Sequence, residues 1–430
     1  MYVRRVQLTD LRGFPKLDFR FEQPNEKYAG WVVITGDNAS GKTALLRAIA
    51  LCLVGPDVAR PLQPSLEGWV RHNASHATMA VEVERDPIAD AYVEPGRTTG
   101  RFWAELEITN GAGARTSAPL LQDLAQRGPL LARRRGPWAP NAAGWFCAGY
   151  GPFRRLYGAS EDAAGLARTP GPTGRFVTLF HEAATLQEAE RWLKDLDHRR
   201  KSGNSEATRV LEVVERLLNA EFLHQGLRVE RIDADGLWLC DTADVVLPMR
   251  DMSDGYRAAV ALLADILRHM IGTYGPDDLL QEQGGRVSVQ RPGVVLVDEI
   301  DVHLHPEWQR NIGFWLKDHL PNVQFIVATH SPLICQAADE RMIFHLPPPG
   351  SDLAPFPLQE QDYWRIVRSK PDEILLTPAF GLKHTRSPLA VAQRRTYTRL
   401  SAKRDAVGLT EAEEGQLKLA LSFVDDEEDA

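Results

Sequence analysis

The sequence has few cysteines and no long uninterrupted apolar run. Its four cysteines are scattered and form no C-x-x-C pair, so neither a disulfide framework nor a zinc site of that kind is predicted. The most apolar segments, near residues 45–54 and 258–271, are too short or too charged to span a bilayer. The first residues alternate as a strand does and lack the apolar core of a signal peptide. These absences favour a cytoplasmic protein with no membrane partner.

Repeats and extended heptads are also missing, which excludes a solenoid and a long coiled coil. After His330 the acidic residues show no spaced D-x-D, so a fused metal-nuclease centre is not predicted and these residues are interpreted as solvated surface. The formal net charge is −8, and part of it comes from the acidic tail at 425–429. This acidity does not exclude a nucleic-acid partner, because binding needs only a local basic surface.

With 430 residues, of which 43% are hydrophobic and 25% charged, the chain is long enough for two or more globular lobes. One stretch, GDNASGKT at 36–43, fits the phosphate-loop pattern G-x-x-x-x-G-K-[ST] at every fixed position. An apolar, β-branched strand is predicted before it at 31–35, and a helix after it at 43–53, ending at Gly55-Pro56. This context is the one that confirms such a motif.

In that setting, backbone N–H groups and the helix N-terminus form an anion site. Lys42 is expected to reach the β- and γ-phosphates, and the Thr43 hydroxyl to ligate Mg²⁺. The expected ATP-binding residues of the loop are Gly36, Asn38, Ala39, Ser40, Gly41, Lys42 and Thr43.

Two further apolar strands end in residues that complete such a site. The run at 294–297 is followed by Asp298 and Glu299, and the run at 325–328 leads to His330. Ligands bind outside the carboxyl ends of parallel strands, so these side chains are expected to face the phosphate loop. Asp298 is expected to hold Mg²⁺ and Glu299 to polarise the attacking water.

The remaining pattern predicts how the chain is organised. Alternating runs between residues 3 and 108 predict an antiparallel β subdomain. Two amphipathic helices, at 188–197 and 206–222, predict a short arm or lid, and a polar loop is expected at 275–293. We therefore predict an α/β fold in four parts: an N-terminal ATPase lobe at 1–118, a mostly helical arm at 119–235, a C-terminal ATPase lobe at 236–345, and an extension with a basic helix and an acidic tail at 346–430.

The motifs GDNASGKT, MSDGYR, VVLVDEID with VHLHP, and ATHSP together resemble those of the ABC-type ATPases of the RecF, SMC and OLD group, over roughly residues 1–344. The resemblance implies an ABC-type ATPase head with a mixed or parallel phosphate-loop sheet. It also implies that Ser253 and Gly255 contact the γ-phosphate of a nucleotide held by a second copy. Asp301 then lies in the dimer-crossing loop, and His330 is the γ-phosphate switch residue.

Two positions depart from that group. The signature reads Ser-Asp-Gly, where transporter ATPases usually have Ser-Gly-Gly. No glutamine stands where the group has its glutamine loop, and Tyr150-Gly151, followed by Arg154 and Arg155, occupies about that place. Without that glutamine, the sequence does not predict how Mg²⁺ binding would be coupled to the arm.

The resemblance implies an ATPase that converts ATP and water to ADP and phosphate, with Lys42, Glu299 and His330 as catalytic residues. Such a protein would form a homodimer or higher homo-oligomer around ATP and act as a switch on double-stranded DNA or on an effector. The short arm and the segment 380–388 are more similar to ATPases of anti-phage systems of the Septu type, which work with a nuclease or toxin. A RecF-like repair ATPase and, less favoured, a transporter nucleotide-binding subunit remain the alternatives.

DNA binding is suggested by three basic runs, which are interpreted either as phosphate contacts or as solvated faces. They are Arg133–Arg135, Arg199–Lys201 and the helix that carries Arg394, Arg395, Arg399, Lys403 and Arg404. The last helix could equally dock an acidic partner or the chain's own acidic tail.

Overall fold

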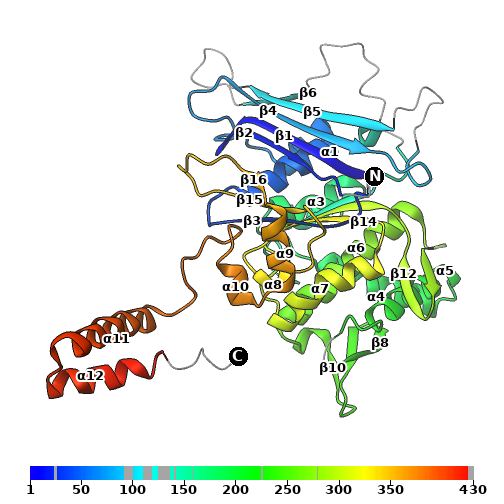
Figure 1. Cartoon of the computed structure of the whole chain (residues 1–430). Coiled ribbons are helices and arrows are strands. Elements are labelled where there is room, and N and C mark those ends of the chain that lie inside the picture. Colours follow the sequence, from blue (N-terminus) through cyan, green and yellow to red (C-terminus); the bar gives the residue numbers. More distant parts are fainter. Residues whose placement is uncertain are drawn as a thin grey trace.

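Helix α1 (Lys42–Leu62) lies between two β-sheets, as the computed structural model shows (Figure 1). The structure describes residues 1–23, 27–91, 100–109, 119–123, 136–139, 142–156, 158–223, 226–277 and 279–424. Within α1, Gly55 has φ 78° and ψ 169°, which breaks the helical path at the predicted end. A short second helical segment follows the break and ends at Leu62.

The central sheet has six strands in the order β16-β15-β3-β14-β13-β7. Its strands are β3 (Gly30–Gly36), β7 (Cys147–Tyr150), β13 (Gly293–Val297), β14 (Val323–Ala328), β15 (Ile343–Leu346) and β16 (Phe356–Pro357). All neighbours are parallel except β16, which runs antiparallel to β15. The carboxyl ends of β3, β13 and β14 therefore meet at one edge, as the sequence predicted.

The second sheet is antiparallel, with the order β2-β1-β4-β5-β6, and it confirms the predicted β subdomain. Its strands are β1 (Tyr2–Leu11), β2 (Phe14–Arg20), β4 (His76–Glu84), β5 (Arg101–Thr109) and β6 (Leu120–Asp123). Residues of β4 alternate between buried and partly exposed positions, because one face packs on α1.

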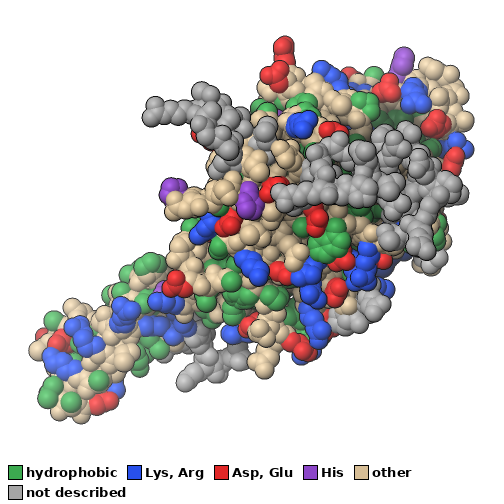
Figure 2. Space-filling model, turned by 90° about the horizontal axis from the view of Figure 1, so that it is seen from above, with side chains coloured by type: hydrophobic (Ala, Val, Ile, Leu, Met, Phe, Trp, Pro, Cys, Tyr) green, Lys and Arg blue, Asp and Glu red, His purple; other side chains and the backbone are tan. Residues whose placement is uncertain are grey.

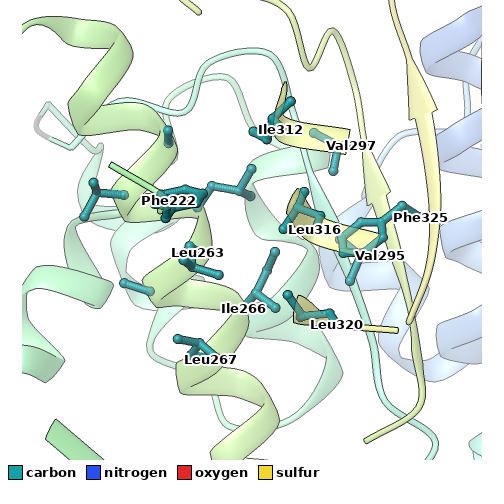
Figure 3. Packing of buried hydrophobic residues seen from close by; sticks show 14 of the residues in the cluster. Phe222, Leu263, Ile266, Leu267, Val295, Val297, Ile312, Leu316, Leu320 and Phe325 are labelled. Atoms are coloured by element: carbon teal, nitrogen blue, oxygen red, sulfur yellow. The ribbon is translucent and has the colours of Figure 1, made fainter. Parts of the chain in front are cut away.

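Strand β13 is buried on both faces, and its residues divide between two cores. Val294 and Leu296 belong to the core that contains α1, whereas Val295 and Val297 belong to the core on the opposite face. That second core includes α6 (Asp254–Tyr274) and α7 (Pro306–His319). Figure 3 shows Leu263, Ile266 and Leu267 of α6 packed near Leu316, Val295 and Phe325, among the other labelled residues.

The range 119–235, predicted as an arm, contributes to the ATPase body. Strand β7 completes the central sheet, and α4 (Gln187–Lys201) and α5 (Ser205–Leu218) pack against α6. Buried residues cover a broad face of α5, and a face that wide must pack on a core. The helices do not project as an arm. Helices α2 (Glu161–Ala167) and α3 (Pro172–Phe180) also lie in this range. Strand β8 (Arg228–Asp233) ends it and forms a three-stranded sheet with β9 (Gly236–Cys240) and β10 (Val246–Pro248), which follow.

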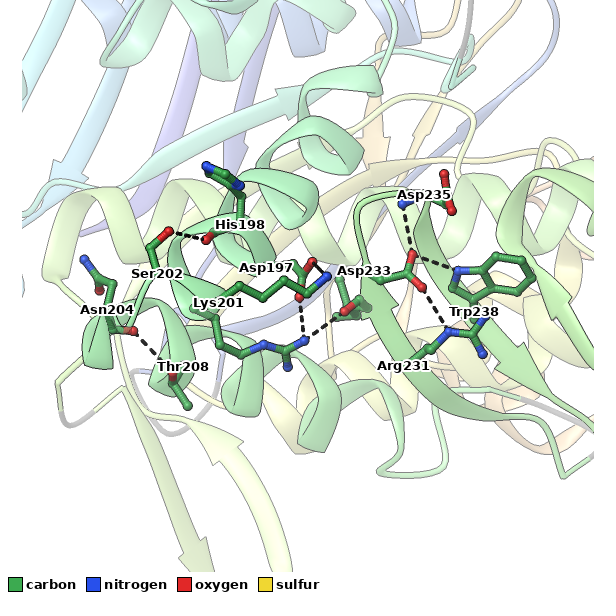
Figure 4. A network of polar contacts seen from close by, with 12 residues as sticks. Asp197, His198, Lys201, Ser202, Asn204, Thr208, Arg231, Asp233, Asp235 and Trp238 are labelled. Carbon is green, nitrogen blue, oxygen red and sulfur yellow. Dashed lines mark hydrogen bonds and ion pairs between the residues drawn. The ribbon is translucent and has the colours of Figure 1, made fainter.

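Carboxylates neutralise the basic run at the end of α4. Asp197 pairs with Arg200 at 2.6 Å and with Lys201 at 2.8 Å, and Arg199 lies within 4.0 Å of Asp195. Figure 4 shows Asp197 and Lys201 beside a second network, in which Asp233 of β8 accepts hydrogen bonds from Arg231 and Trp238. Because its charges are already paired, this run offers little positive potential to phosphates. Arg133–Arg135 lie outside the described residues.

The segment predicted as a polar loop at 275–293 contains a hairpin, so that prediction was wrong. Strands β11 (Leu280–Gln283) and β12 (Arg286–Val289) pair across Gly284 and Gly285, both at positive φ. The turn signal was present, but the hairpin depends on packing of β12 against α5 and α7, which lie far away in the sequence.

The first part of the predicted C-terminal extension belongs to the ATPase body, since β16 joins the central sheet. Helices α9 (Glu360–Arg368) and α10 (Pro371–Leu375) follow and pack on α8 (Pro332–Cys335). The extension ends in a hairpin of α11 (Pro388–Val407) and α12 (Glu411–Leu421), and α11 is the predicted basic helix. The acidic tail at 425–429 lies outside the described residues. Across the ranges that the structure describes, no helix combines the length and the apolar character needed to cross a membrane.

Candidate nucleotide site

The phosphate loop begins where β3 ends, and its two fixed glycines are required by close contacts. A Cβ on Gly36 (φ 149°) would lie 2.5 Å from the Leu346 carbonyl oxygen. A Cβ on Gly41 (φ 98°) would lie 2.6 Å from the Phe14 ring. Only glycine fits both the backbone angles and the space at these two positions.

Lys42 is 6% exposed, and its ammonium group donates to the carbonyl oxygens of Gly36 at 2.8 Å and Asp37 at 3.0 Å. Burial lowers the pKa of Lys42, although the nearby carboxylates of Asp298 and Glu299 oppose that shift. Ser40 has a buried hydroxyl with no hydrogen-bond partner among the described residues. The loop therefore holds a cation and an unpaired hydroxyl beside a ring of backbone N–H groups, as an anion site does.

Thr43 and Asp298 join α1 to the end of β13. The Thr43 hydroxyl donates to Asp298 Oδ2 at 2.6 Å, while Oδ1 of the same carboxylate is buried with no partner in the described part of the chain. Burial raises the pKa of Asp298, and the hydrogen bond from Thr43 opposes that shift. A hydroxyl and a carboxylate with an unsatisfied oxygen are donors of the kind that Mg²⁺ prefers, so these residues fit that ion.

The loops after β13 and β14 are fastened to each other. Thr329 donates its hydroxyl to Asp301 Oδ1 at 2.5 Å, and the His330 backbone N–H donates to the same oxygen at 3.3 Å. Glu299 has φ 45°, a left-handed conformation that is uncommon for a non-glycine residue. Glu299 and His330 thereby both line the cavity that faces the phosphate loop.

This cavity has a volume of about 830 Å³ and brings together most of the predicted site. Its lining includes the loop residues 38–44 together with Glu299 and His330. The sequence reasoning did not assign three other parts of the lining: residues 12–16, Arg71 and the proline-rich segment 347–355. Arg12-Gly13-Phe14 forms a Gly/Pro turn and also resembles the start of proteins of the RecF, SMC and OLD group, and the prolines at 347–349 indicate a boundary. Neither signal indicates what the segment faces.

The signature residues lie elsewhere. Ser253 is the exposed N-cap of α6, and Gly255 lies against the backbone of His303, on the loop that follows β13. Of the described residues that line the nucleotide cavity, none comes from this segment. The predicted contact between the signature and a nucleotide is therefore not one that the described lining of this cavity provides.

Arg154 is a buried residue whose role the sequence did not reveal. Its guanidinium donates to the carbonyl oxygens of Gly151 at 2.8 Å, Asp298 at 2.9 Å and Glu299 at 3.0 Å. Burial lowers the pKa of Arg154 to about 10, with Asp298 among the carboxylates that oppose the shift, so the group stays charged at neutral pH. One side chain thus fixes the backbone that carries the site's carboxylates.

We expect Arg154→Lys to destabilise the fold and slow turnover, because lysine cannot reach several carbonyls with one planar fork. The loss of hydrogen bonds to buried carbonyls should lower the free energy of unfolding by about 2–3 kcal/mol. Arg155→Lys is the matched control, since Arg155 is exposed. Thermal melting and phosphate release for both variants test this, and equal behaviour would remove Arg154 from the site.

Comparisons with known proteins agree with this geometry. Two family models match. The model for residues 5–118 is described as "AAA domain", and the model for residues 175–336 as "AAA domain, putative AbiEii toxin, Type IV TA system". Both matched segments are thus similar to AAA domains.

Named relatives narrow the class. The "Retron Ec83 probable ATPase" of Escherichia coli is 34% identical over 163 residues, 37% of this chain and 28% of that protein. "Septu protein PtuA" of Bacillus mycoides (strain KBAB4) is 23% identical over 338 residues, 77% of this chain and 38% of its own length. The "Retron Vc95 probable ATPase" of Vibrio cholerae serotype O1 biovar El Tor is 24% identical over 405 residues, 79% of this chain and 72% of that protein.

The chain is therefore similar to AAA ATPase domains and to Septu and retron ATPases, which confirms the resemblance at that level. It spans between about a quarter and two fifths of the length of the first two relatives. Among solved structures, the SMC head domain from Thermotoga maritima is similar with a TM-score of 0.43 and 14% identity, over 84% of this chain and 100% of that one.

Proposed function

We propose that this protein binds Mg-ATP between two copies of the chain and hydrolyses it, and that the cycle switches an effector on or off. The observation that carries the proposal is the convergence of Lys42, Thr43, Asp298, Glu299 and His330 at the carboxyl ends of parallel strands. The matched ATPase domains and the ATPase-named relatives support it.

Each residue has a role in this proposal. Lys42 leaves its two carbonyl partners to bind the β- and γ-phosphates, and the loop N–H groups hold their oxygens. Thr43 and Asp298 would hold a bound Mg²⁺, which would supply positive charge against the phosphates. Glu299 accepts a proton from the water that adds to the γ-phosphorus, as the bond to the ADP oxygen breaks and phosphate leaves. His330 contacts the γ-phosphate.

The signature segment supplies the other half of the site, with Ser253 and Gly255 reaching the nucleotide of a second copy. The loop 301–305 supports this arrangement, because it lies between the carboxylates and the signature of the same chain. In this proposal the assembly is a homodimer or a larger oligomer built from such pairs.

Gly255→Ala tests the second half of the site. The added Cβ would lie 2.4 Å from the His303 carbonyl oxygen, a distance at which the loop or the signature must move. We expect the variant to bind ATP as a monomer with unchanged affinity and to lose ATP-driven dimerisation. Gly272→Ala, on the same helix with open space around it, is the control and should behave as wild type. Normal dimerisation of Gly255→Ala would contradict the assigned role.

The effector is proposed to be a nuclease or toxin of an anti-phage system. The names of the Septu and retron relatives support this placement. The test is co-expression with the proteins encoded beside this chain, followed by measurement of complex mass and nucleic-acid cleavage with and without Mg-ATP. A stable complex whose cleavage responds to nucleotide is expected, and neighbours that neither bind nor cleave would contradict the role.

A further inference from the structure

The C-terminal hairpin of α11 and α12 is nearly all surface. Figure 1 shows it standing away from the ATPase body, and within the two helices only Leu400 and Ala420 are buried. The turn is fixed by a capping box between Thr410 and Glu413. Most side chains of α11 are not buried in a core, so packing does not explain its composition. We therefore ask which binding partner its exposed side chains would suit.

Every charged side chain from residue 383 to residue 404 is basic, in a chain whose net charge is −8. These side chains are Lys383, Arg386, Arg394, Arg395, Arg399, Lys403 and Arg404. Figure 2 shows Lys and Arg side chains gathered over the projecting part of the molecule. So long a segment of one sign repels itself, and an anionic partner would relieve that repulsion.

Part of this charge is already engaged within the hairpin. Lys403 pairs with Glu413 at 2.5 Å, Arg404 pairs with Asp405 at 3.1 Å, and Arg394 donates to the carbonyl oxygens of Phe423 and Val424. Arg395 and Arg399 are different. Both are exposed, and within the described ranges no carboxylate pairs with either.

Arg395 and Arg399 line a cavity of about 520 Å³ between α11 and the segment before it. Helix α11 contributes Val391, Arg394 and Thr398 to the same wall, at the helical spacing that places side chains on one face. The preceding segment adds His384 and Arg386. The cavity is thus concave, basic and built from two stretches of chain.

We propose that this surface binds the phosphate backbone of a nucleic acid. A guanidinium presents a planar fork that matches phosphate oxygens, and Arg395 and Arg399 both present theirs in the wall of this cavity. An acidic protein would offer carboxylates to the same guanidinium groups, and binding of poly-glutamate in the experiment below distinguishes it from a nucleic acid. The surface binds whether or not the chain hydrolyses ATP, so its test is independent of the proposed function.

The experiment measures binding of the full chain, without nucleotide, to labelled short duplex DNA, single-stranded DNA and duplex RNA, from about 50 to 200 mM salt. Arg395→Gln with Arg399→Gln removes two positive charges from the cavity. The matched control, Arg209→Gln with Arg216→Gln, removes two from the exposed side of α5. We expect the first pair to lower affinity at about 50 mM salt at least tenfold and to reduce the slope of log K against log salt by about 1.8.

The control pair should bind as wild type does. A third variant, Arg395→Lys with Arg399→Lys, should keep most of the slope, and it provides a readout if the glutamine variant melts at a lower temperature. An unchanged slope in the glutamine variant would overturn the proposal, as would a wild-type chain that binds labelled poly-glutamate but none of the nucleic acids.

Discussion

Glu299→Gln is expected to bind Mg-ATP with wild-type affinity and to accumulate as a dimer, while turnover falls by about 10²- to 10⁴-fold. The amide keeps the shape of the side chain but cannot accept the proton of the attacking water. Since Glu299 lines the cavity and Asp298 remains beside Thr43, the sites for phosphates and cation stay intact. Phosphate release and mass in solution, each with and without Mg-ATP, check both parts.

The control for this variant is Glu360→Gln, at the exposed start of α9. It should release phosphate at the wild-type rate and dimerise only transiently. A Glu299→Gln chain that keeps hydrolysing ATP would show that another group accepts the proton. One that stops hydrolysing yet remains monomeric with saturating Mg-ATP would show that the nucleotide is not shared between copies.

Lys42→Ala should weaken the nucleotide binding on which all later steps depend. The lysine is the buried cation of the phosphate loop, and charge-assisted hydrogen bonds of this type contribute about 1.5–3 kcal/mol each. We therefore expect nucleotide affinity to fall by about 10- to 100-fold, measured by equilibrium binding of a fluorescent ATP analogue. Lys370→Ala, at an exposed position before α10, is the control. Normal affinity in Lys42→Ala would refute the phosphate-loop assignment.

The residues at the carboxyl ends of β3, β13 and β14 could be predicted, because the sequence patterns that indicate them are local. One apolar run is followed by Asp298 and Glu299, and another by His330. Each polar residue that follows such a run marks the carboxyl end of a parallel strand, where ligands bind. The topology then places those ends beside the phosphate loop with no further information. The antiparallel sheet was predictable for the same reason. Only one of its faces is covered by α1, so buried and exposed residues alternate along strands such as β4.

The parts that failed depend on distant packing. The apolar pattern of α4 and α5 is the same whether the helices form a separate lid or pack on the ATPase body. Only their contacts with α6 show that they pack on the body. Arg154 resembles its exposed neighbour Arg155 in the sequence, yet it is buried against carbonyls about 145 residues away. The basic run at Arg199–Lys201 is a different case, because Asp197 lies three and four residues before Arg200 and Lys201 on the same helix, a spacing that could have been read from the sequence.

A mixed assembly would test the central claim, that one nucleotide is held by two copies, most directly. In the Glu299→Gln background, chains that also carry Lys42→Ala are combined with chains that also carry Gly255→Ala, and the mass is measured with Mg-ATP. Each chain alone lacks one half of every shared site and should remain monomeric. The mixture restores one complete site, so a heterodimer with one bound nucleotide is expected. A mixture that stays monomeric, or either chain dimerising alone, would contradict the account.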